Sequence, residues 1–417
     1  MTHIAGSVPL SQDSPLAREA AGLDACVHCG FCLNACPTYL ALEDENDSPR
    51  GRLVLMRQML DGDIALTDPD ATTHLDRCLG CRGCETACPS GVPYGELLEA
   101  TRATIAKARP LPWNARAILF VFAHPRLLAF VMACSRAFRA TGIPRLLARI
   151  PHKAFFPFAM LASTARRTAS RGGSPAGADT GDTTAAFLTG CVMEGLLSPA
   201  NRATERALAT NGYRLAAAPG QQCCGALHAH AGDDSTARTL ARANVAAFEA
   251  SGAEFIAVNS AGCGAMMKAY GHLLRDDPDW SERAKAVAAR VRDVSELLVA
   301  AGPRATGGPE LRVAYDAPCH LQHGQRVVTE PIQVLSVIRG VTLVPLAGSD
   351  QCCGSAGIFN LLEPDVADRV LRPKLAQIEA SRVDIVATGN PGCLMQIGGG
   401  LLRAGSRTVA RHPVELI

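Results

Sequence analysis

The sequence predicts a mixed fold of α+β and α/β type, in which a helical, cysteine-rich N-terminal domain precedes two repeated α/β units. Two observations lead to this prediction. Eight of the 17 cysteines stand in two equal groups within the first quarter of the chain. From residue 185 onward, short apolar segments alternate with alanine-rich segments, and the same order occurs twice. Such alternation is typical of layered α/β units with mostly parallel sheets.

Length and composition fit a globular chain with more than one core. The chain has 417 residues, of which 48% are hydrophobic and 19% charged, which is enough for two or three domains. The formal net charge of +2 gives no reason to expect nucleic acid as a partner. The N-terminus has no basic start followed by an apolar run, so we expect a cytoplasmic protein whose clustered cysteines bind metal rather than form disulfides.

The first predicted domain, residues 1–100, contains the same cysteine motif twice. Each copy fits C-x2-C-x2-C-x3-C-P, the spacing of [4Fe-4S] ligands in two-cluster ferredoxins, in which the fourth cysteine binds the other cluster. The ligands predicted for cluster I are Cys26, Cys29, Cys32 and Cys88. The ligands predicted for cluster II are Cys78, Cys81, Cys84 and Cys36. Zinc sites usually show paired knuckles instead of triplets followed by Cys-Pro, so we expect two [4Fe-4S] clusters.

Two clusters side by side predict electron transfer. All eight predicted ligands are cysteines, so neither cluster has an open position for a substrate. We therefore expect a relay that passes electrons singly between neighbouring centres, and no catalytic residue in this domain.

Residues 101–184 are predicted to be a basic helical connector. Its first part, residues 101–173, has 13 Lys and Arg residues and no Asp or Glu. Basic charge beside apolar runs suits a helix lying on an anionic membrane surface, and it equally suits docking on an acidic partner subunit. Residues 171–184 are rich in Gly, Thr and Asp and are expected to be a flexible linker.

The apolar stretch 117–135 of the connector is interrupted by His124, Pro125 and Arg126. A membrane-spanning helix needs about 20 uninterrupted apolar residues, so we expect a helical hairpin here. Cys134 stands alone in this stretch and is expected to be a buried thiol.

The two predicted repeats span residues 185–305 and 306–417. Each contains one cysteine, then a Cys-Cys-Gly triplet, then a last cysteine at closely matching intervals. The first set is Cys191, Cys223, Cys224 and Cys263. The second set is Cys319, Cys352, Cys353 and Cys393. Two interpretations stay open: each set binds an additional iron–sulfur or zinc centre, or the thiols are buried without a metal.

Secondary structure in the repeats follows from the apolar pattern. Short apolar segments bounded by turn residues are expected to be buried strands, and alanine-rich segments are expected to be helices. The expected strands are 185–191, 254–260, 311–316, 342–346 and 383–388. The expected helices are 199–210, 235–251 and 364–380.

The repeats resemble the cysteine-rich CCG domains of heterodisulfide reductases and related iron–sulfur subunits. In those domains the last cysteine usually belongs to a C-x-x-C pair. Here Ser260 and Asn390 replace the first cysteine of that pair. Each site is therefore one thiolate short, which speaks against the five-cysteine cluster and the disulfide-reducing chemistry of that family.

The chain as a whole resembles the iron–sulfur subunits of glycolate oxidases (glycolate dehydrogenases). Besides the cysteine motifs, the phrases that carry the resemblance are SPRGR (48–52), HLDRCLGCRGCETACPSGV (74–92), SAGCGAMMKAYG (260–271) and LQH (321–323). The resemblance implies an oxidoreductase complex on the inner face of the cell membrane. In it, FAD-linked subunits oxidise glycolate to glyoxylate, and this subunit passes the electrons towards quinone.

Other functions remain open at the level of sequence. An equivalent subunit of a lactate or glycerol-3-phosphate dehydrogenase would keep the same chemistry, and a heterodisulfide-reductase-like subunit would perform chemistry at the CCG units. A structural zinc scaffold is the third alternative. No G-x-G-x-x-G opens a helix after a strand, so substrate oxidation is expected on a partner chain.

Overall fold

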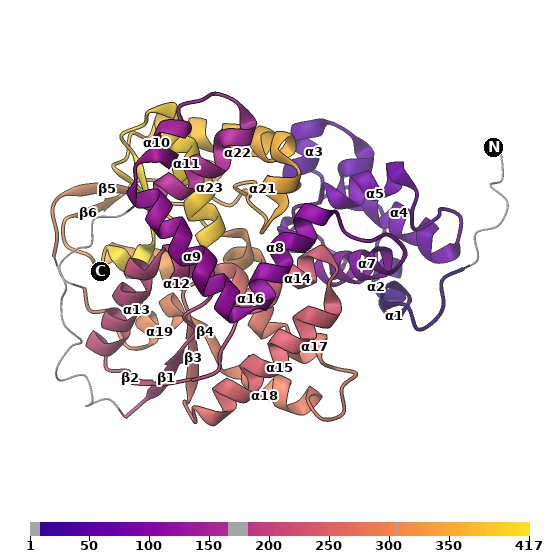
Figure 1. Cartoon of the computed structure of the whole chain (residues 1–417), viewed down its shortest axis with the longest axis horizontal. Helices are drawn as coiled ribbons and strands as arrows, with labels where there is room; N and C mark the ends of the chain where they lie inside the picture. The colour runs from indigo at the N-terminus through magenta and orange to yellow at the C-terminus, as the bar shows by residue number, and fades with distance from the viewer. Residues whose placement is uncertain (1–8, 166–181, 306) are drawn as a thin grey trace. The chain divides into compact units, whose positions relative to one another are not determined.

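The computed structural model describes residues 9–165, 182–305 and 307–417 (Figure 1). Most of the predicted linker 171–184 lies outside the described residues. The chain divides into two compact units. Unit 1 comprises Met1–Leu119, Leu227–Ala237 and Gly354–Val370, and unit 2 comprises Phe120–Ala226, Arg238–Cys353 and Leu371–Ile417. The domain boundaries expected from the sequence stay predictions, because these units follow spatial proximity and not the repeat.

Unit 1 is helical over its described residues, as the sequence predicts for the cysteine-rich domain. Several helices begin with a capping residue followed by proline; Ser48, for example, accepts a hydrogen bond from the backbone N–H of Gly51, and Pro49 fills the first helical position. The helices are α1 (Pro15–Arg18), α2 (Ala20–Asp24), α3 (Pro37–Leu42), η1 (Glu45–Asp47), α4 (Pro49–Asp61), α5 (Pro69–Asp76), α6 (Gly83–Thr86), α7 (Tyr94–Ala108), α14 (Ala226–Ala231) and α21 (Phe359–Leu362), with the first half of α8 (Trp113–Ala123) and the start of α22 (Pro364–Ser381).

The core of unit 1 supports the cysteine loops directly. Leu16, Met56, Leu75 and Leu97 are completely buried and pack in one cluster that includes the half-buried or buried side chains of several cysteines. The loops between the helices are therefore anchored on a rigid apolar base, which fixes where the thiols lie.

Unit 2 contains two sheets of the same topology, which confirms the repeat and the parallel pairing (Figure 1). In the first sheet the strand order is β2-β1-β3-β4, and in the second it is β6-β5-β7-β8, with every pair parallel. The first sheet consists of β1 (Thr184–Phe187), β2 (Arg214–Ala216), β3 (Phe255–Val258) and β4 (Val291–Asp293). The second consists of β5 (Leu311–Tyr315), β6 (Val341–Leu343), β7 (Ile385–Ala387) and β8 (Val409–Arg411).

The helices of unit 2 include the three expected from alanine-rich segments, α13, α15 and α22. Beside the second half of α8 they are α9 (Pro125–Ala140), α10 (Ile143–Leu147), η2 (Lys153–Phe155), α11 (Phe156–Ser163), α12 (Val192–Leu196), α13 (Ser198–Thr210), α15 (Asp234–Ala250), α16 (Ala261–Lys268), α17 (Tyr270–Leu273), α18 (Ser281–Arg290), α19 (Val294–Ala300), η3 (His320–Gly324), α20 (Glu330–Ser336), α22 (Pro364–Ser381), α23 (Pro391–Ala404) and η4 (Pro413–Glu415).

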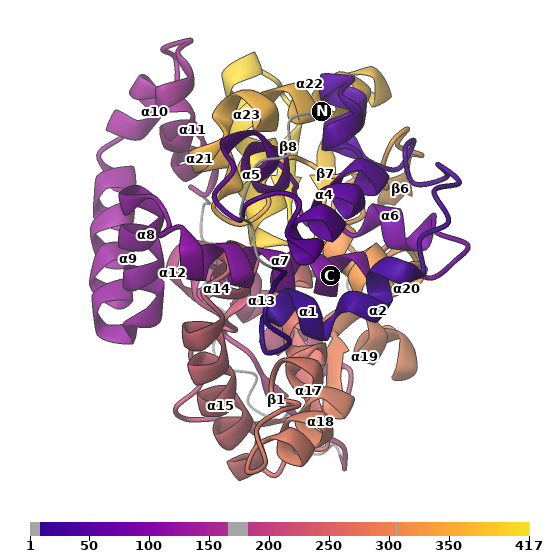
Figure 2. The ribbon, with the colours of Figure 1, turned by 90° about the vertical axis from the view of Figure 1, so that its right-hand side faces the viewer.

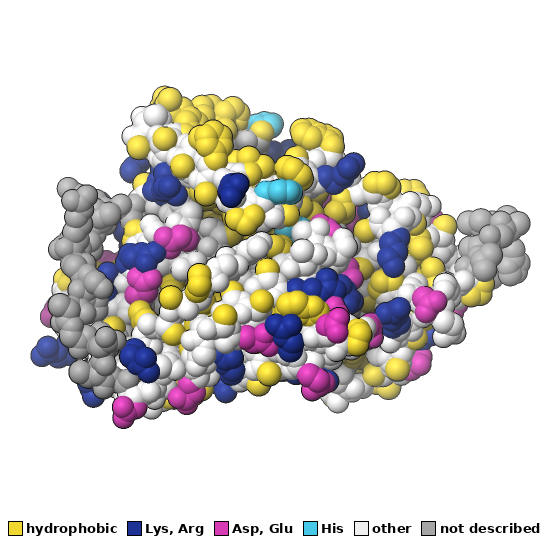
Figure 3. Space-filling model, turned by 60° about the horizontal axis from the view of Figure 1, so that its bottom comes forward, with side chains coloured by type: hydrophobic (Ala, Val, Ile, Leu, Met, Phe, Trp, Pro, Cys, Tyr) yellow, Lys and Arg dark blue, Asp and Glu magenta, His cyan; other side chains and the backbone are white. Residues whose placement is uncertain are grey.

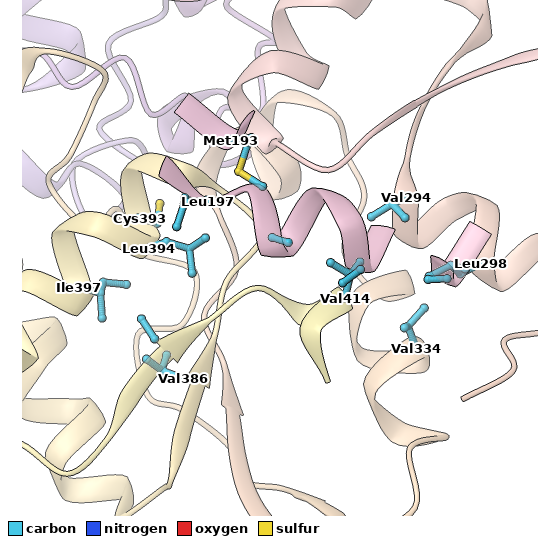
Figure 4. Close-up of a cluster of buried hydrophobic side chains, with 14 of the residues drawn as sticks. Met193, Leu197, Val294, Leu298, Val334, Val386, Cys393, Leu394, Ile397 and Val414 are labelled. Carbon is cyan, nitrogen blue, oxygen red and sulfur yellow. The ribbon is translucent and has the colours of Figure 1, made fainter. Parts of the chain in front are cut away.

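Both repeats contribute to one hydrophobic core in unit 2 (Figure 4). Met193 and Leu197 of the first repeat belong to the same buried cluster as Leu394 and Val414 of the second. Each repeat also ends in the same local structure, because Asp293 and His412 both begin a capping box with a glutamate three residues later. The parts of the two repeats that belong to unit 2 therefore share one core.

The connector forms a bent helix pair, as predicted for the apolar stretch 117–135. Helices α8 and α9 are bent by 105°, and none of the described helices is by itself long and apolar enough to cross a membrane. Figure 2 shows α9, α10 and α11 in one layer, and α11 packs against α23. The prediction of a buried Cys134 is wrong: this thiol is exposed on α9, because the buried stripe of the amphipathic helix passes through Met132 instead.

Two arginines of α9 donate hydrogen bonds to a neighbouring helix of unit 2, α12. Arg136 donates to the carbonyl of Gly195 at 2.8 Å, and Arg139 donates to the carbonyl of Leu196 at 3.1 Å. Both acceptors lie at the C-terminal end of α12, where cations are favourable. A Cβ at Gly195 would come within 2.6 Å of Met132, so glycine is required for the close approach of α9 and α12. Part of the connector's positive charge therefore secures the helix that follows Cys191.

Candidate metal centres

The first predicted cluster site is a cavity at the surface of unit 1. Cys26, Cys29 and Cys32 of the first motif line it together with Cys84 and Cys88 of the second. His28 and Gly30 adopt positive φ angles of 54° and 84°, which turns the loop between the cysteines tightly enough to bring them together. The cavity thus collects all four residues predicted for cluster I, namely Cys26, Cys29, Cys32 and Cys88.

The second predicted site is buried and combines cysteines of both motifs. Burial raises the pKa of Cys84 well above its usual value, and the negative charges of neighbouring cysteines raise it further. These neighbours are Cys81, Cys78 and Cys36. Cys36 comes from the first motif, so the crossed grouping predicted for cluster II is present as spatial proximity.

Hydrogen-bond donors surround the sulfurs of the second site. Cys78 Sγ lies 3.6 Å from the hydroxyl of Tyr94 and 3.5 Å from the backbone N of Gly80. Donors of this kind stabilise negative charge on sulfur and raise the potential of a cluster bound there. A buried thiol crowded by other cysteines, as Cys84 is, forms a thiolate readily only when a cation is bound beside it, so the donor set fits an iron–sulfur centre.

Arg52, which belongs to the SPRGR segment, is completely buried. Its guanidinium donates to Asp47 Oδ1 at 3.0 Å and to Thr38 Oγ1 at 3.0 Å, and it lies 3.9 Å from Cys36 Sγ. Burial alone would lower the pKa of Arg52, but the surrounding anionic groups raise it above its usual value. A permanent positive charge therefore stands beside the second site. Arg50 instead forms an exposed pair with Glu45.

The four cysteines of the first repeat meet at the carboxyl ends of its strands, where α/β folds place their sites. Cys191 follows β1, and its Sγ lies 3.7 Å from that of Cys223. The pKa of Cys191 is raised well above its usual value, first by the hydrogen bond to Cys223 and then by burial. Hydrogen bonds to Cys223 and Cys263 likewise raise the pKa of Cys224. The predicted set is therefore one buried group.

The four cysteines of the second repeat form an equivalent group. Cys353 Sγ lies 3.1 Å from Cys393 Sγ. A hydrogen bond to Cys352, followed by burial, raises the pKa of Cys319. Each of these repeats thus gathers four cysteines without a disulfide, which is a donor set suited to a thiophilic metal.

The two residues that replace the C-x-x-C cysteines behave differently. Asn390 donates from Nδ2 to Cys393 Sγ at 3.5 Å and accepts from the backbone N of Gly262 at 3.2 Å. Ser260 is buried, and its hydroxyl has no partner among the described residues. In the second repeat the position of the missing cysteine is thus filled by a hydrogen-bonded amide, and in the first repeat by a hydroxyl without a hydrogen-bond partner among the described residues.

Buried polar residues hold the two groups, and sequence reasoning missed them. In the first repeat, Asn244 donates to the carbonyl of Cys223 at 3.0 Å, and Tyr270 donates to the carbonyl of Cys224 at 2.8 Å. In the second repeat, Lys374 forms a buried ion pair with Asp316 and donates to the carbonyl of Gly348 at 2.9 Å. The sequence signal for Asn244 and Lys374 is that both stand at the same distance before the last cysteine of their repeat.

Comparison with known proteins agrees with this organisation. A family model described as a 4Fe-4S dicluster domain matches residues 22–92, and one described as a cysteine-rich domain matches residues 185–268 and 313–398. The probable glycolate oxidase iron-sulfur subunit of Bacillus subtilis is 36% identical over 412 residues, covering 94% of this chain and 92% of the relative. This chain belongs to the glycolate oxidase iron-sulfur subunit family.

Other relatives place the family in a wider group. The glycolate oxidase iron-sulfur subunit of Escherichia coli is 35% identical to this chain over 404 residues, covering 95% of this chain and 93% of the relative. Lactate utilization protein A of Geobacillus thermodenitrificans is 30% identical over 235 residues, which is 55% of this chain and 96% of that protein. The glycolate oxidase iron-sulfur subunits therefore match this chain over nearly its whole length, and the lactate proteins match about half of it.

Proposed function

We propose that this chain is the electron-transfer subunit of a glycolate oxidase complex, in which FAD-linked partner subunits oxidise glycolate to glyoxylate. The electrons leave this subunit towards a quinone. The proposal is supported by the gathering of both cysteine motifs of unit 1 around a shared region, in a chain whose nearly full-length relatives are glycolate oxidase iron-sulfur subunits. A bound [4Fe-4S] cluster at each group supplies reversible one-electron storage.

The two cysteine groups in unit 1 have separate tasks in this proposal. The loop of the first group is exposed: Cys29 is at the surface, and Val27 and Phe31 are 67% and 69% exposed. Large exposed apolar side chains mark contact surfaces, so we assign this loop to the flavin partner. The second group is buried beside Arg52, whose charge stabilises added electrons. The ligand sets are those predicted from the sequence.

The two repeat groups are proposed to hold further metal centres. Seven of these eight thiols are buried and Cys191 is partly buried. The pKa values of Cys191, Cys224, Cys319 and Cys353 are raised, so forming thiolates there is costly unless a metal binds them. Zinc and iron–sulfur are the two candidates, and metal analysis separates them.

We also propose peripheral contact of the connector with the membrane. The connector combines basic residues with exposed apolar side chains, as interfacial segments do. The large exposed apolar side chains in its described residues include Trp113, Phe120, Phe130 and Leu146. On the face that Figure 3 presents, basic and acidic side chains are interleaved, which does not favour nucleic acid.

A second candidate function is an equivalent role in lactate oxidation. The similarity to lactate utilization protein A favours it, although that similarity covers about half of this chain. Assaying the purified complex with glycolate and lactate in parallel separates the two functions.

The crossed ligation is tested with Cys36→Ser. We expect loss or alteration of the buried cluster's EPR signal, with the exposed cluster's signal largely kept. Cys134→Ser is the matched control, since this exposed thiol belongs to none of the groups. Equal loss of both signals in a folded Cys36→Ser protein, judged by unchanged circular dichroism, would contradict the crossed assignment.

A further inference from the structure

Unit 1 contains a cavity of about 230 Å³ that the electron relay does not require. It lies among α7, α14, α21 and the loop that begins α8. Its wall is mostly apolar, and the main apolar contributors are Leu79, Ile105, Leu111, Leu227, Ile358 and Phe359. Ligand pockets are typically about 300–1,000 Å³, so this cavity suits a single small ring system and is too small for a flavin or nicotinamide dinucleotide.

One part of the wall belongs to the buried cysteine group. Cys78 and Leu79 both line the cavity. Arg102 fixes this wall, because its guanidinium donates to the carbonyls of Cys78 at 2.7 Å and Leu75 at 3.0 Å. A molecule in the cavity therefore touches a residue assigned to cluster II. This adjacency selects a redox-active ligand over an inert one.

The cavity also contains groups that can supply protons. His230 lines it, and its Nδ1 is held 2.9 Å from Glu99 Oε1. Glu363 lines it as well, and burial raises the pKa of this carboxyl. A histidine held by a carboxylate is a common proton donor and acceptor. Apolar walls with a few such polar groups are what an aromatic ring with two carbonyl oxygens requires.

The rim of the cavity faces a side chain suited to a lipid interface. Pro112 and Asn114 line the cavity, and Trp113 between them is 81% exposed. Tryptophan is enriched where protein meets lipid headgroups. An apolar carrier dissolved in a membrane would therefore enter beside Trp113.

We propose that this cavity is the site at which a quinone ring is bound and reduced. The proposal rests on the proposed function, which supplies the electrons from the reduced flavin of the partner subunit. The ring takes up two electrons, one at a time, from the side of Cys78. Two protons, delivered through His230 and replaced from solvent, bind its two carbonyl oxygens and give the hydroquinone. The reduced flavin of the partner subunit is oxidised by losing the same two electrons.

The test fills the cavity and leaves the cysteines untouched. Ala106 on α7 and Ala231 on α14 both line the cavity and are half-buried, so Ala106→Phe and Ala231→Leu place side-chain atoms inside it. Ala108→Phe is the matched control, because Ala108 is exposed on the same helix and does not line the cavity. The cluster-loaded, dithionite-reduced chain is mixed with a tail-less benzoquinone, and reoxidation is followed by visible absorbance. Ferricyanide serves as the reference oxidant, since it needs no apolar site.

We expect each filling variant to slow reoxidation by quinone roughly tenfold or more, while ferricyanide rates stay unchanged. Ala108→Phe should match the unmodified chain with both oxidants. Unchanged quinone rates in both filling variants would overturn the proposed site. If the unmodified chain is reoxidised by ferricyanide but not by quinone, the quinone acceptor itself is wrong. If it holds no reducible clusters, the proposed function fails independently of the cavity.

Discussion

The two repeats in unit 2 share their backbone and differ in the buried polar groups behind their cysteines. Their strand orders are the same, and Asn244 and Lys374 stand equally far before the last cysteine of each repeat. In the first repeat the side-chain amide of Asn244 donates hydrogen bonds to the carbonyl of Cys223 and to the hydroxyl of Tyr270. In the second, Lys374 pairs with Asp316, whose counterpart before Cys191 is the apolar Leu188.

This difference shows that the backbone fold places the thiols, whereas the buried side chains behind them set the local charge. Parallel strands and the helices that follow them bring four thiols together in both repeats. The residue on the long helix then sets the charge next to the thiols, with a neutral amide in one repeat and a buried ion pair in the other. Two sites of equal shape therefore differ in electrostatics, and we expect any metal centres they hold to differ in potential.

The largest expected effect comes from breaking the ion pair of the second repeat. Lys374→Met leaves Asp316 buried and unpaired, which should lower the free energy of unfolding by about 3–5 kcal/mol. Burial already raises the pKa of Asp316 although Lys374 opposes it, so the loss should be smaller at acidic than at neutral pH. Urea unfolding followed by circular dichroism measures both.

Two further variants serve as controls for this prediction. Asn244→Ala, at the equivalent position, leaves only neutral groups unpaired and should cost about 1–3 kcal/mol. The double variant Lys374→Met with Asp316→Leu copies the apolar pattern of the first repeat and should regain most of the stability. Equal losses for Asn244→Ala and Lys374→Met, without recovery in the double variant, would show that the ion pair does not distinguish the repeats.

An intermediate effect is expected from the caps that end the repeats. Burial raises the pKa of Asp293 to about 6, above the value near 3.9 of an unfolded chain. Its contribution to stability is therefore full below about pH 4 and is lost as the pH rises through about 6. Asp293→Asn keeps a capping side chain and should flatten the pH dependence of stability across this window by about 2 kcal/mol.

The corresponding cap of the second repeat provides the control for the pH experiment. His412→Asn leaves Asp293 in place, so urea midpoints between about pH 4 and 7 should keep the slope that Asp293 causes. A slope that survives Asp293→Asn would assign the pH dependence to another group.

The smallest expected effect concerns the residues that replace the C-x-x-C cysteines. Ser260→Ala removes a buried hydroxyl without a partner and should leave stability unchanged or raise it by up to about 1 kcal/mol. Asn390→Ala removes the acceptor of the Gly262 N–H and should cost about 1–2 kcal/mol. Thermal unfolding of both variants measures the two changes in stability, and the decisive feature is that these changes have opposite signs. A loss in Ser260→Ala as large as that in Asn390→Ala would contradict the reported difference.

The sequence predicts the cysteine groups and the repeat because these depend on spacing along the chain. The strands around Phe187 and Val386 are recognisable as apolar runs. Strands β2, β4 and β8 have three residues each and each includes an arginine, so none of them shows as an apolar run. Cys134 was misplaced because an apolar stretch does not reveal which face of its helix is buried.

The buried charges were beyond sequence reasoning for a different reason. Asp47 and Arg52 are completely buried, although charged residues this close in sequence usually lie at the surface. Asp316 and Lys374 are brought together by the fold, far apart in sequence, and no local pattern reports such a pair. Fixed charges near the thiols therefore require the structure.

The most direct test of the central claim is the content of iron, acid-labile sulfide and zinc in anaerobically purified chain, combined with low-temperature EPR of the reduced sample. We expect at least about eight iron and eight sulfide per chain and two interacting cluster signals from unit 1. Iron beyond that number would assign iron–sulfur centres to the repeats, and zinc would assign zinc to them. Zinc without labile sulfide, and no EPR signal on reduction, would contradict the electron relay.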